Sequence, residues 1–400
     1  MISQVMPEAQ SLLGSLPDNK MRASTPPACH LVRSGRNPDV RLLSGGLPTS
    51  ERSADIMTFP KEKESTTSGS PLDPAASSSG RRITRLSEIP YSHNPVMVTE
   101  ITQLFSKVPP GVIVDATLGG GGHAYAILKS RPDLKLIGID RDQTALSVSK
   151  KRLVQFEGRT SFIHDRFDNL GAILEMLGVE KIAGALFDLG VSSYQIDNPD
   201  RGFSFRKDGP LDMRMDSTQG RTAQDLVNEE SEIEIARILK QYGDERFHRR
   251  ISKAIIAARP ILTTGELADV VLAAMPAHSK RSVGHPARRT FQAIRIAVNQ
   301  ELFVLRPAIA QTIQFLQLGG RCGILSYHSG EDRIIKQMLR EHAGLKRQNS
   351  RYVPEIDEEF PITLLSRKGL QPSEKEIENN PRSSSARLRT FEKLLEISHG

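Results

Sequence analysis

The chain has 400 residues, more than a usual single domain, and no run of 18 apolar residues, which excludes a transmembrane helix and predicts no membrane partner. Lys and Arg number 54 against 47 Asp and Glu, a net charge of +7 that suits a polyanionic partner without demanding one. The two cysteines, Cys29 and Cys322, exclude a disulfide scaffold and have no metal-type spacing with histidine, so we expect a reducing compartment and no metal site.

Residues 1–88 are rich in Ser, Pro and Gly and lack apolar periodicity, so the sequence predicts a disordered extension there. The first stretch contains Glu8 and Asp18 and has neither an Arg-rich amphipathic pattern nor the apolar core of a signal peptide. We therefore expect a cytoplasmic protein. An organelle matrix is the alternative if the extension is a leader.

Residues 89–204 have the pattern of strands alternating with helices. A helix-like stretch at 124–129 lies between the first two of four apolar runs. The runs, three of which end in Asp, are Gly111–Asp115, Leu134–Asp140, Ser161–His164 and Ala183–Asp188. Such alternation predicts a parallel α/β sheet, and residues 89–204 would be the first part of that domain.

Residues 205–290 have the pattern of helices instead. Ser231–Glu234 and Thr263–Glu266 match the capping box, in which the first and fourth residues each bond the other's backbone N–H. Strand character returns at Arg321–Ser326 and Pro361–Leu365. We predict a helical insertion at 205–290 within one α/β domain, whose second part is 291–400.

A predicted strand runs directly into four glycines in Asp115-Ala-Thr-Leu-Gly-Gly-Gly-Gly-His123. Glycines let the backbone approach a ligand closely and adopt positive φ, and the following helix points its first N–H groups at that ligand. Asp140 ends the next strand, where a carboxylate accepts both hydroxyls of a ribose. These features indicate a nucleoside-containing cofactor.

Two cofactors share this geometry. A nicotinamide dinucleotide needs G-x-G-x-x-G, which four consecutive glycines followed by His do not match. The Asp115 carboxylate would repel a pyrophosphate but would suit the cationic amino and sulfonium end of S-adenosylmethionine. The sequence favours this methyl donor over an NAD-type oxidoreductase. A glycine-rich surface turn with capping aspartates is the third interpretation.

Asp188 ends the fourth predicted strand, and ligands of such sheets bind beyond the carboxyl ends of the strands. An exocyclic base amine is a poor nucleophile because its lone pair is delocalised into the ring. A carboxylate or carbonyl that accepts its N–H bonds localises that pair, so Asp188, with the Leu189 carbonyl, is the candidate catalytic residue. The alternative is that Asp188 caps a turn or binds the adenosine.

A polar loop at 200–216 follows, dense in Arg, Asp and Gly with interleaved Phe, Leu and Met. Long loops inside compact chains are functional or disordered, and the interleaved apolar residues argue against disorder. We predict an ordered active-site wall; a salt-bridged structural loop is the alternative.

Nine motifs follow one another from about residue 90 to the C-terminus. They are His93–Met97, Asp115–His123, Ile139–Asp142, Asp188–Ser193, Arg201–Phe205, Asp208–Asp216, Tyr242–Arg246, Arg289–Arg295, and Tyr327–Ser329 with Glu331–Arg333. Together they resemble the bacterial small-subunit rRNA (cytosine-N4)-methyltransferase family. Two departures are Gly330, where that family usually has Leu, and the 88-residue extension.

The resemblance implies a Rossmann-like S-adenosylmethionine-dependent methyltransferase with an inserted helical substrate domain. It implies N4-methylation of a cytosine in the decoding region of 16S rRNA, with the small-subunit rRNA or the 30S subunit as partner. In that family the cofactor is held by residues that match Gly121, Gly122, His123, Asp140, Phe167, Asp188 and Gln195. Phe167 would lie against the adenine. The sequence does not decide between a monomer and a homodimer.

Basic residues of the predicted insertion form two groups that suit RNA phosphates. They are Arg246, Arg249, Arg250 and Lys253 on one helix, and Lys280, Arg281, Arg288 and Arg289 around a loop. The target base must be splayed out or already exposed to reach the methyl group. His328 with Ser329, Glu331 and Asp332 are candidates to line its pocket. A non-catalytic ribosome-assembly factor that keeps the fold is a further hypothesis.

Overall fold

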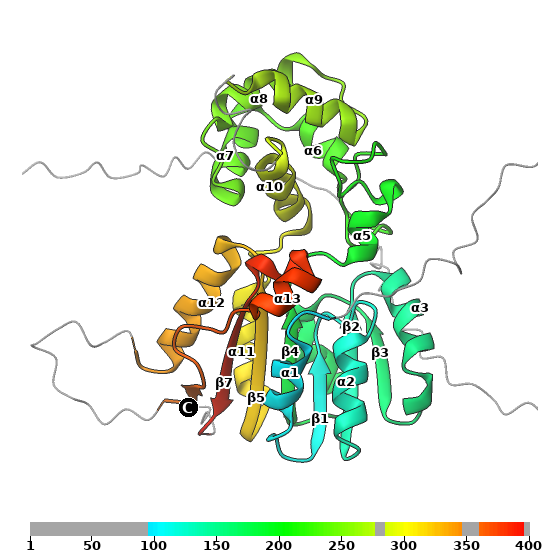
Figure 1. Ribbon diagram of the computed structural model, residues 1–400, viewed down its shortest axis with the longest axis vertical. Helices are drawn as coiled ribbons and strands as arrows, with labels where there is room; N and C mark the ends of the chain where they lie inside the picture. Colours follow the sequence, from blue (N-terminus) through cyan, green and yellow to red (C-terminus); the bar gives the residue numbers. More distant parts are fainter. Residues whose placement is uncertain (1–94, 277–284, 346–359, 396–400) are drawn as a thin grey trace, which may run out of the picture. The chain divides into compact units, whose positions relative to one another are not determined.

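The computed structural model describes residues 95–276, 285–345 and 360–395, all within one compact unit at 82–400 (Figure 1). The predicted extension at 1–88, together with His93, Lys280 and Arg281, lies outside the described residues. None of the helices in these three ranges is long and apolar enough to cross a membrane.

Within the described ranges the centre of the molecule is a seven-stranded sheet in the order β3-β2-β1-β4-β5-β7-β6 (Figure 1). The strands are β1 Gly111–Asp115, β2 Leu134–Asp140, β3 Thr160–His164, β4 Ile182–Asp188, β5 Leu316–Ser326, β6 Ile362–Leu364 and β7 Arg387–Lys393. All six predicted strands are confirmed, although β5 begins at Leu316 rather than Arg321. Six of the seven residues of β4 are buried, as expected for a parallel strand covered on both faces.

The predicted parallel pairing of the four strands in residues 89–204 is confirmed, and the sheet adds an antiparallel edge. Strands β1 to β5 pair in parallel, but β7 pairs antiparallel with both β5 and β6. Strand β7 was not predicted, because its sequence RLRTFEK carries four charged residues. All four find partners in the folded chain. Arg387 and Arg389 pair with Asp332, and Glu392 pairs with Arg321. The Lys393 ammonium donates to the Ile313 carbonyl.

Helices cover both faces of the sheet, and neighbouring strand residues pack against opposite layers. Helices α1 Val98–Phe105, α2 Gly122–Ser130 and α3 Gln143–Arg152 share a core with Ile113 and Leu186. Helices α4 Leu170–Met176, α11 Leu305–Phe315 and α12 Ser329–His342 share the other core with Val114 and Phe187. Because β1, β2 and β4 are parallel and each ends in an aspartate, the three acids lie at the same carboxyl edge of the sheet.

Five helices between β4 and β5 lie together apart from the sheet (Figure 1). Their buried side chains form a hydrophobic core of their own. The helices are α6 Ala223–Glu229, α7 Glu232–Gly243, α8 His248–Ala257, α9 Thr264–Ala274 and α10 Arg288–Asn299. Thr263 and Glu266 form the reciprocal capping box of α9. Ser231 caps α7, but the Glu234 carboxylate pairs with Arg237. Gly243 is required where α7 crosses α10, since a Cβ there would lie 2.6 Å from the Arg289 carbonyl oxygen.

Candidate functional site

A cavity of about 900 Å³ lies at the carboxyl ends of β1, β2 and β4. The glycine loop, the ends of these strands and the loop after β4 form one side of its wall. Residues of the 203–206 loop and of α10 form another side, so the sheet and the helical insertion share one cavity. The parallel strands bring these elements together because their carboxyl ends meet at one edge.

The glycine loop is held by the carboxylate that ends β2. Asp140 accepts the Gly119 N–H at 2.7 Å through Oδ2 and the Asp142 N–H at 2.8 Å through Oδ1. Gly119 and Gly122 line the cavity with Asp140, whereas Gly121 lies behind them as the cap of α2. At Gly121 φ is +72° and a Cβ would lie 3.1 Å from that of Ser149, so the loop needs glycine there.

Burial raises the pKa of both acids that end the strands beside the glycine loop, Asp140 and Asp115. It raises the pKa of Asp140 to about 6, although the two backbone N–H donors lower it. It raises the pKa of Asp115 to about 8, so that this carboxyl is mostly protonated at neutral pH. Asp115 is 2% exposed and is not part of the cavity wall. The expectation that an Asp115 anion faces the cationic end of a methyl donor is therefore wrong.

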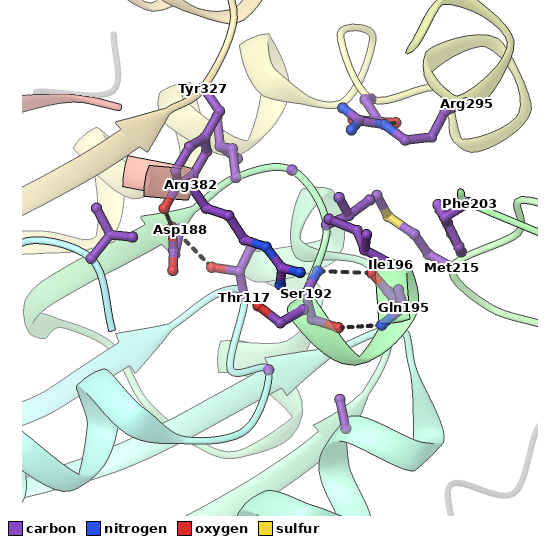
Figure 2. Close-up of a pocket in the computed structure, with 18 of the residues that line it drawn as sticks. Thr117, Asp188, Ser192, Gln195, Ile196, Phe203, Met215, Arg295, Tyr327 and Arg382 are labelled. Atoms are coloured by element: carbon purple, nitrogen blue, oxygen red, sulfur yellow. Dashed lines mark hydrogen bonds and ion pairs between the residues drawn. The ribbon is translucent and has the colours of Figure 1, made fainter. Parts of the chain in front are cut away.

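Gln195 lines the cavity with both ends of its amide engaged by the protein. Its Oε1 accepts the Ser192 N–H at 3.0 Å, while the Ser192 hydroxyl accepts the Gln195 N–H, which caps α5 Ser193–Asp197 (Figure 2). Its Nε2 donates to Asp142 Oδ2 at 3.0 Å. Phe167, at the start of a short helical turn after β3, also lines the cavity, with its ring edge-on to Phe187. Both residues shape the wall beside Asp140.

Arg201 joins the α/β domain to the polar loop, and the local sequence did not reveal this role. Its guanidinium donates to Asp142 Oδ2 at 2.6 Å and to the carbonyls of Arg214 and Met215. The side chains of Arg201 and Asp142 are 12% and 5% exposed, so this ion pair is nearly dry. The loop it fixes contributes Phe203 and Met215 to the cavity wall.

Asp188 ends β4, and its Oδ1 and its backbone N–H are both hydrogen-bonded. Its Oδ1 accepts the Tyr327 hydroxyl at 2.6 Å, and its backbone N–H donates to the Thr117 hydroxyl at 2.6 Å (Figure 2). Its Oδ2 lies 3.6 Å from His123 Nδ1, while His123 Nε2 lies 2.9 Å from the Val96 carbonyl. Burial raises the pKa of Asp188, and His123 and Tyr327 counteract that rise.

The far side of the cavity is aromatic and charged. The Phe205 ring stacks on His285 with centroids 4.5 Å apart, and Arg295 forms a two-fold ion pair with Glu301. His328 and Glu331 line the cavity, whereas Ser329 and Asp332 do not. One possible metal-ligand atom comes from each of Glu301, His328 and Glu331, and these atoms lie within 4.8 Å of one another. Both carboxylates already accept hydrogen bonds, Glu301 from Arg295 and Glu331 from the Tyr327 backbone N–H.

A segment near the C-terminus closes the remaining side, which the sequence did not predict. Residues 380–382 and 384–385, around the short helix η5 Pro381–Ser385, line the cavity. Arg382 forms an ion pair with Asp197 at 2.8 Å. The preceding helix α13 Glu374–Asn379 is tied to α1 because Glu376 accepts the Met97 N–H at 2.6 Å.

Comparison with known proteins gives consistent matches over the described domain. The model of the MraW methylase family matches residues 90–394. A protein named "Ribosomal RNA small subunit methyltransferase H" from Thermobifida fusca is 45% identical over 311 residues, which cover 76% of this chain and 94% of that protein. Proteins of the same name from Halothermothrix orenii and Clostridioides difficile are 46% and 44% identical, and each match covers 76% of this chain and 99% of the relative.

Proposed function

Because the chain belongs to the MraW methylase family, we propose that it transfers a methyl group to N4 of a cytosine in the decoding region of small-subunit rRNA. The chain is a methyltransferase and its cofactor is S-adenosylmethionine, so the NAD-type oxidoreductase interpretation is wrong. The observation that carries the proposal is the single cavity that joins the glycine loop and Asp188 to the helical insertion. We place the reaction in the cytoplasm, with the 30S subunit or its rRNA as substrate.

The residues around the glycine loop fit S-adenosylmethionine. Gly119, Gly120 and Gly122 line the cavity with backbone, and Gly122 has no room for a side chain, since a Cβ there would lie 2.6 Å from Pro95 Cγ. We propose that Asp140 accepts the ribose hydroxyls and that the Phe167 ring lies against the adenine. The cofactor would also depend on the shape that Gly121, Gly122 and Gln195 give to the cavity wall. His123 would contribute through its position beside Asp188.

When bound, S-adenosylmethionine would supply a methyl group attached to a sulfonium sulfur, which leaves when a lone pair attacks the methyl carbon. Asp188 Oδ2 accepts an N–H bond of the exocyclic amine and so localises the nitrogen lone pair toward the methyl carbon. The Leu189 carbonyl accepts the second N–H bond. As the new N–C bond forms, the nitrogen becomes acidic, and Asp188 takes its proton. In-line displacement requires little more from the protein than this positioning.

Mapping of methylated cytidines by mass spectrometry tests the proposal. Small subunits from cells that lack the protein are expected to lack one N4-methylcytidine in the decoding region, and purified protein with S-adenosylmethionine restores it. Methylation of a different base, or of the large subunit, would contradict the proposal. A protein that binds the subunit but transfers no labelled methyl group would instead support the assembly-factor hypothesis.

Asp140→Ala is expected to raise the dissociation constant of S-adenosylmethionine about 10- to 100-fold, because hydrogen bonds to a charged group contribute about 1.5–3 kcal/mol. Calorimetric titration measures it. In the wild type, affinity should fall as the pH drops below about 6, where the Asp140 carboxylate becomes protonated. Glu175→Gln, at an exposed site on α4, is the control and should bind normally. Unchanged affinity in Asp140→Ala would exclude the ribose role.

We propose that the helical insertion contacts rRNA, as its basic residues support. Arg249 and Arg250 are exposed on α8, and Arg288 of α10 lines the cavity. Phosphate contacts made by such residues position the RNA and weaken with salt. Lys280 and Arg281 lie outside the described residues and add nothing to this argument.

Arg249→Glu combined with Arg250→Glu should weaken binding to the small subunit at least about 10-fold at physiological salt. The slope of log affinity against log salt should fall by about one for each phosphate that the variant no longer neutralises. Filter binding over a salt series measures both, and affinity for S-adenosylmethionine should stay unchanged. Lys150→Glu with Lys151→Glu, exposed on α3, makes the same charge change as a control. Equal weakening by both pairs would exclude a specific α8 surface.

A further inference from the structure

Tyr327 follows directly after β5 and reaches the end of the neighbouring strand β4. The two strand ends are joined because the Leu189 N–H donates to the Leu325 carbonyl at 3.1 Å. The Tyr327 ring lies close to the backbone of Gly190, where an added Cβ would be 3.6 Å from Cδ2 of the ring. The ring also packs against the core that contains Leu186, and its hydroxyl meets Asp188 Oδ1 at 2.6 Å (Figure 2).

The hydrogen bond leaves the two oxygens of Asp188 in different situations. Oδ1 is taken by the Tyr327 hydroxyl, whereas Oδ2 lies 3.6 Å from His123 Nδ1, beyond hydrogen-bond range. A carbonyl only accepts, so His123 Nε2 must carry the proton that it donates to Val96. Oδ2 is therefore the oxygen that is open to an incoming donor.

We propose that Tyr327 is a positioning residue for methyl transfer, whose hydroxyl keeps Asp188 an ionised carboxylate and leaves Oδ2 to accept the proton of the substrate amine. The inference rests on the proposed function. In the step, the nitrogen–methyl bond forms as the sulfur–methyl bond breaks, and the amine proton passes to Oδ2. Tyr327 keeps its own proton, since burial raises the pKa of its hydroxyl further above the ordinary value.

Charged and titratable groups surround Asp188 on each element that packs against it. Burial and Glu331 on α12 oppose a negative charge on Asp188, and the charge of Asp188 in turn helps to raise the pKa of Asp115 on β1. His123 on α2 and Tyr327 after β5 favour that charge. Of these groups, Tyr327 donates the 2.6 Å hydrogen bond to Asp188 Oδ1. Its removal is therefore expected to leave Asp188 protonated up to a higher pH.

The test is the pH profile of single-turnover methyl transfer for Tyr327→Phe, which keeps the packed ring and removes the hydroxyl. The acidic limb should move upward by about one pH unit, because removal of a donor to the carboxylate raises its pKa. At high pH the rate should approach that of the wild type. Tyr125→Phe, on α2 outside the cavity wall, is the matched control and should keep the wild-type profile. A rate loss in Tyr327→Phe that is equal at every pH would overturn the proposal.

A second measurement needs no catalysis. The ¹³C carboxyl resonance of Asp188, assigned by its absence in Asp188→Asn, can be titrated in the full-length wild type and in Tyr327→Phe. An upward-shifted titration in the variant supports the proposal, and superimposable curves overturn it. If the wild type transfers no methyl group to rRNA, the proposed function fails while this titration still decides the role of the hydroxyl.

Discussion

Asp188→Asn is expected to lower the single-turnover rate of methyl transfer by about 100- to 10,000-fold, the usual contribution of a positioned proton acceptor. Asparagine has nearly the same shape as aspartate, but its amide cannot accept a proton. Single-turnover assays with saturating S-adenosylmethionine and small subunits measure the effect. Asp200→Asn, an exposed acid nearby outside the cavity wall, is the control.

The same substitution separates the two roles that the sequence left open for Asp188. If Asp188 acts on the amine, the loss lies in the rate, and the affinities for cofactor and rRNA change little. If it mainly binds the adenosine, the loss lies in the dissociation constant of S-adenosylmethionine. The pH profile gives a second criterion. Only the carboxylate accepts a proton, so the wild-type rate should rise with pH through the raised pKa of Asp188, and Asp188→Asn should lose this dependence.

Arg201→Ala is expected to lower the free energy of unfolding by about 3–5 kcal/mol, because it leaves the buried Asp142 carboxylate without its cation. The guanidinium bonds to the carbonyls of Arg214 and Met215 disappear as well. Urea denaturation of the full chain measures the change. Since Asp142 also holds Gln195, affinity for S-adenosylmethionine should fall in parallel.

Two further variants make the Arg201 result specific. Arg237→Ala removes an exposed ion pair with Glu234 on α7 and should cost less than about 1 kcal/mol. Asp142→Asn added to Arg201→Ala removes the uncompensated charge and should restore part of the stability. If Arg201→Ala were no more destabilising than Arg237→Ala, the dry ion pair would not be what fixes the polar loop.

Much of the α/β framework could be predicted because buried parallel strands leave a local signature. Gly111–Asp115 and Ala183–Asp188 are short apolar runs that end in an acid, and the structure places both acids at the same sheet edge. Strand β7 leaves no such signature. Its charged residues find partners only in the folded chain, so no window of sequence reveals that Arg389 and Lys393 are buried.

The candidate site was predictable where one motif supplies it and not where distant segments meet. The glycine loop and Asp140 are 21 residues apart, and strand spacing already indicates that they face one cavity. Tyr327 and Asp188 are separated by 139 residues, and Arg201 and Asp142 by 59. Asp115 shows the opposite failure: its position suggested an anion, but burial raises its pKa to about 8.

The late position of β7 in the chain has a consequence for synthesis of the protein. Strand β7 lies inside the sheet between β5 and β6, and η5 just before it completes the cavity wall. A nascent polypeptide that ends before residue 380 therefore has an unpaired β5 edge, which invites aggregation, and an open cofactor pocket. A premature stop codon there removes an interior strand rather than a dispensable tail.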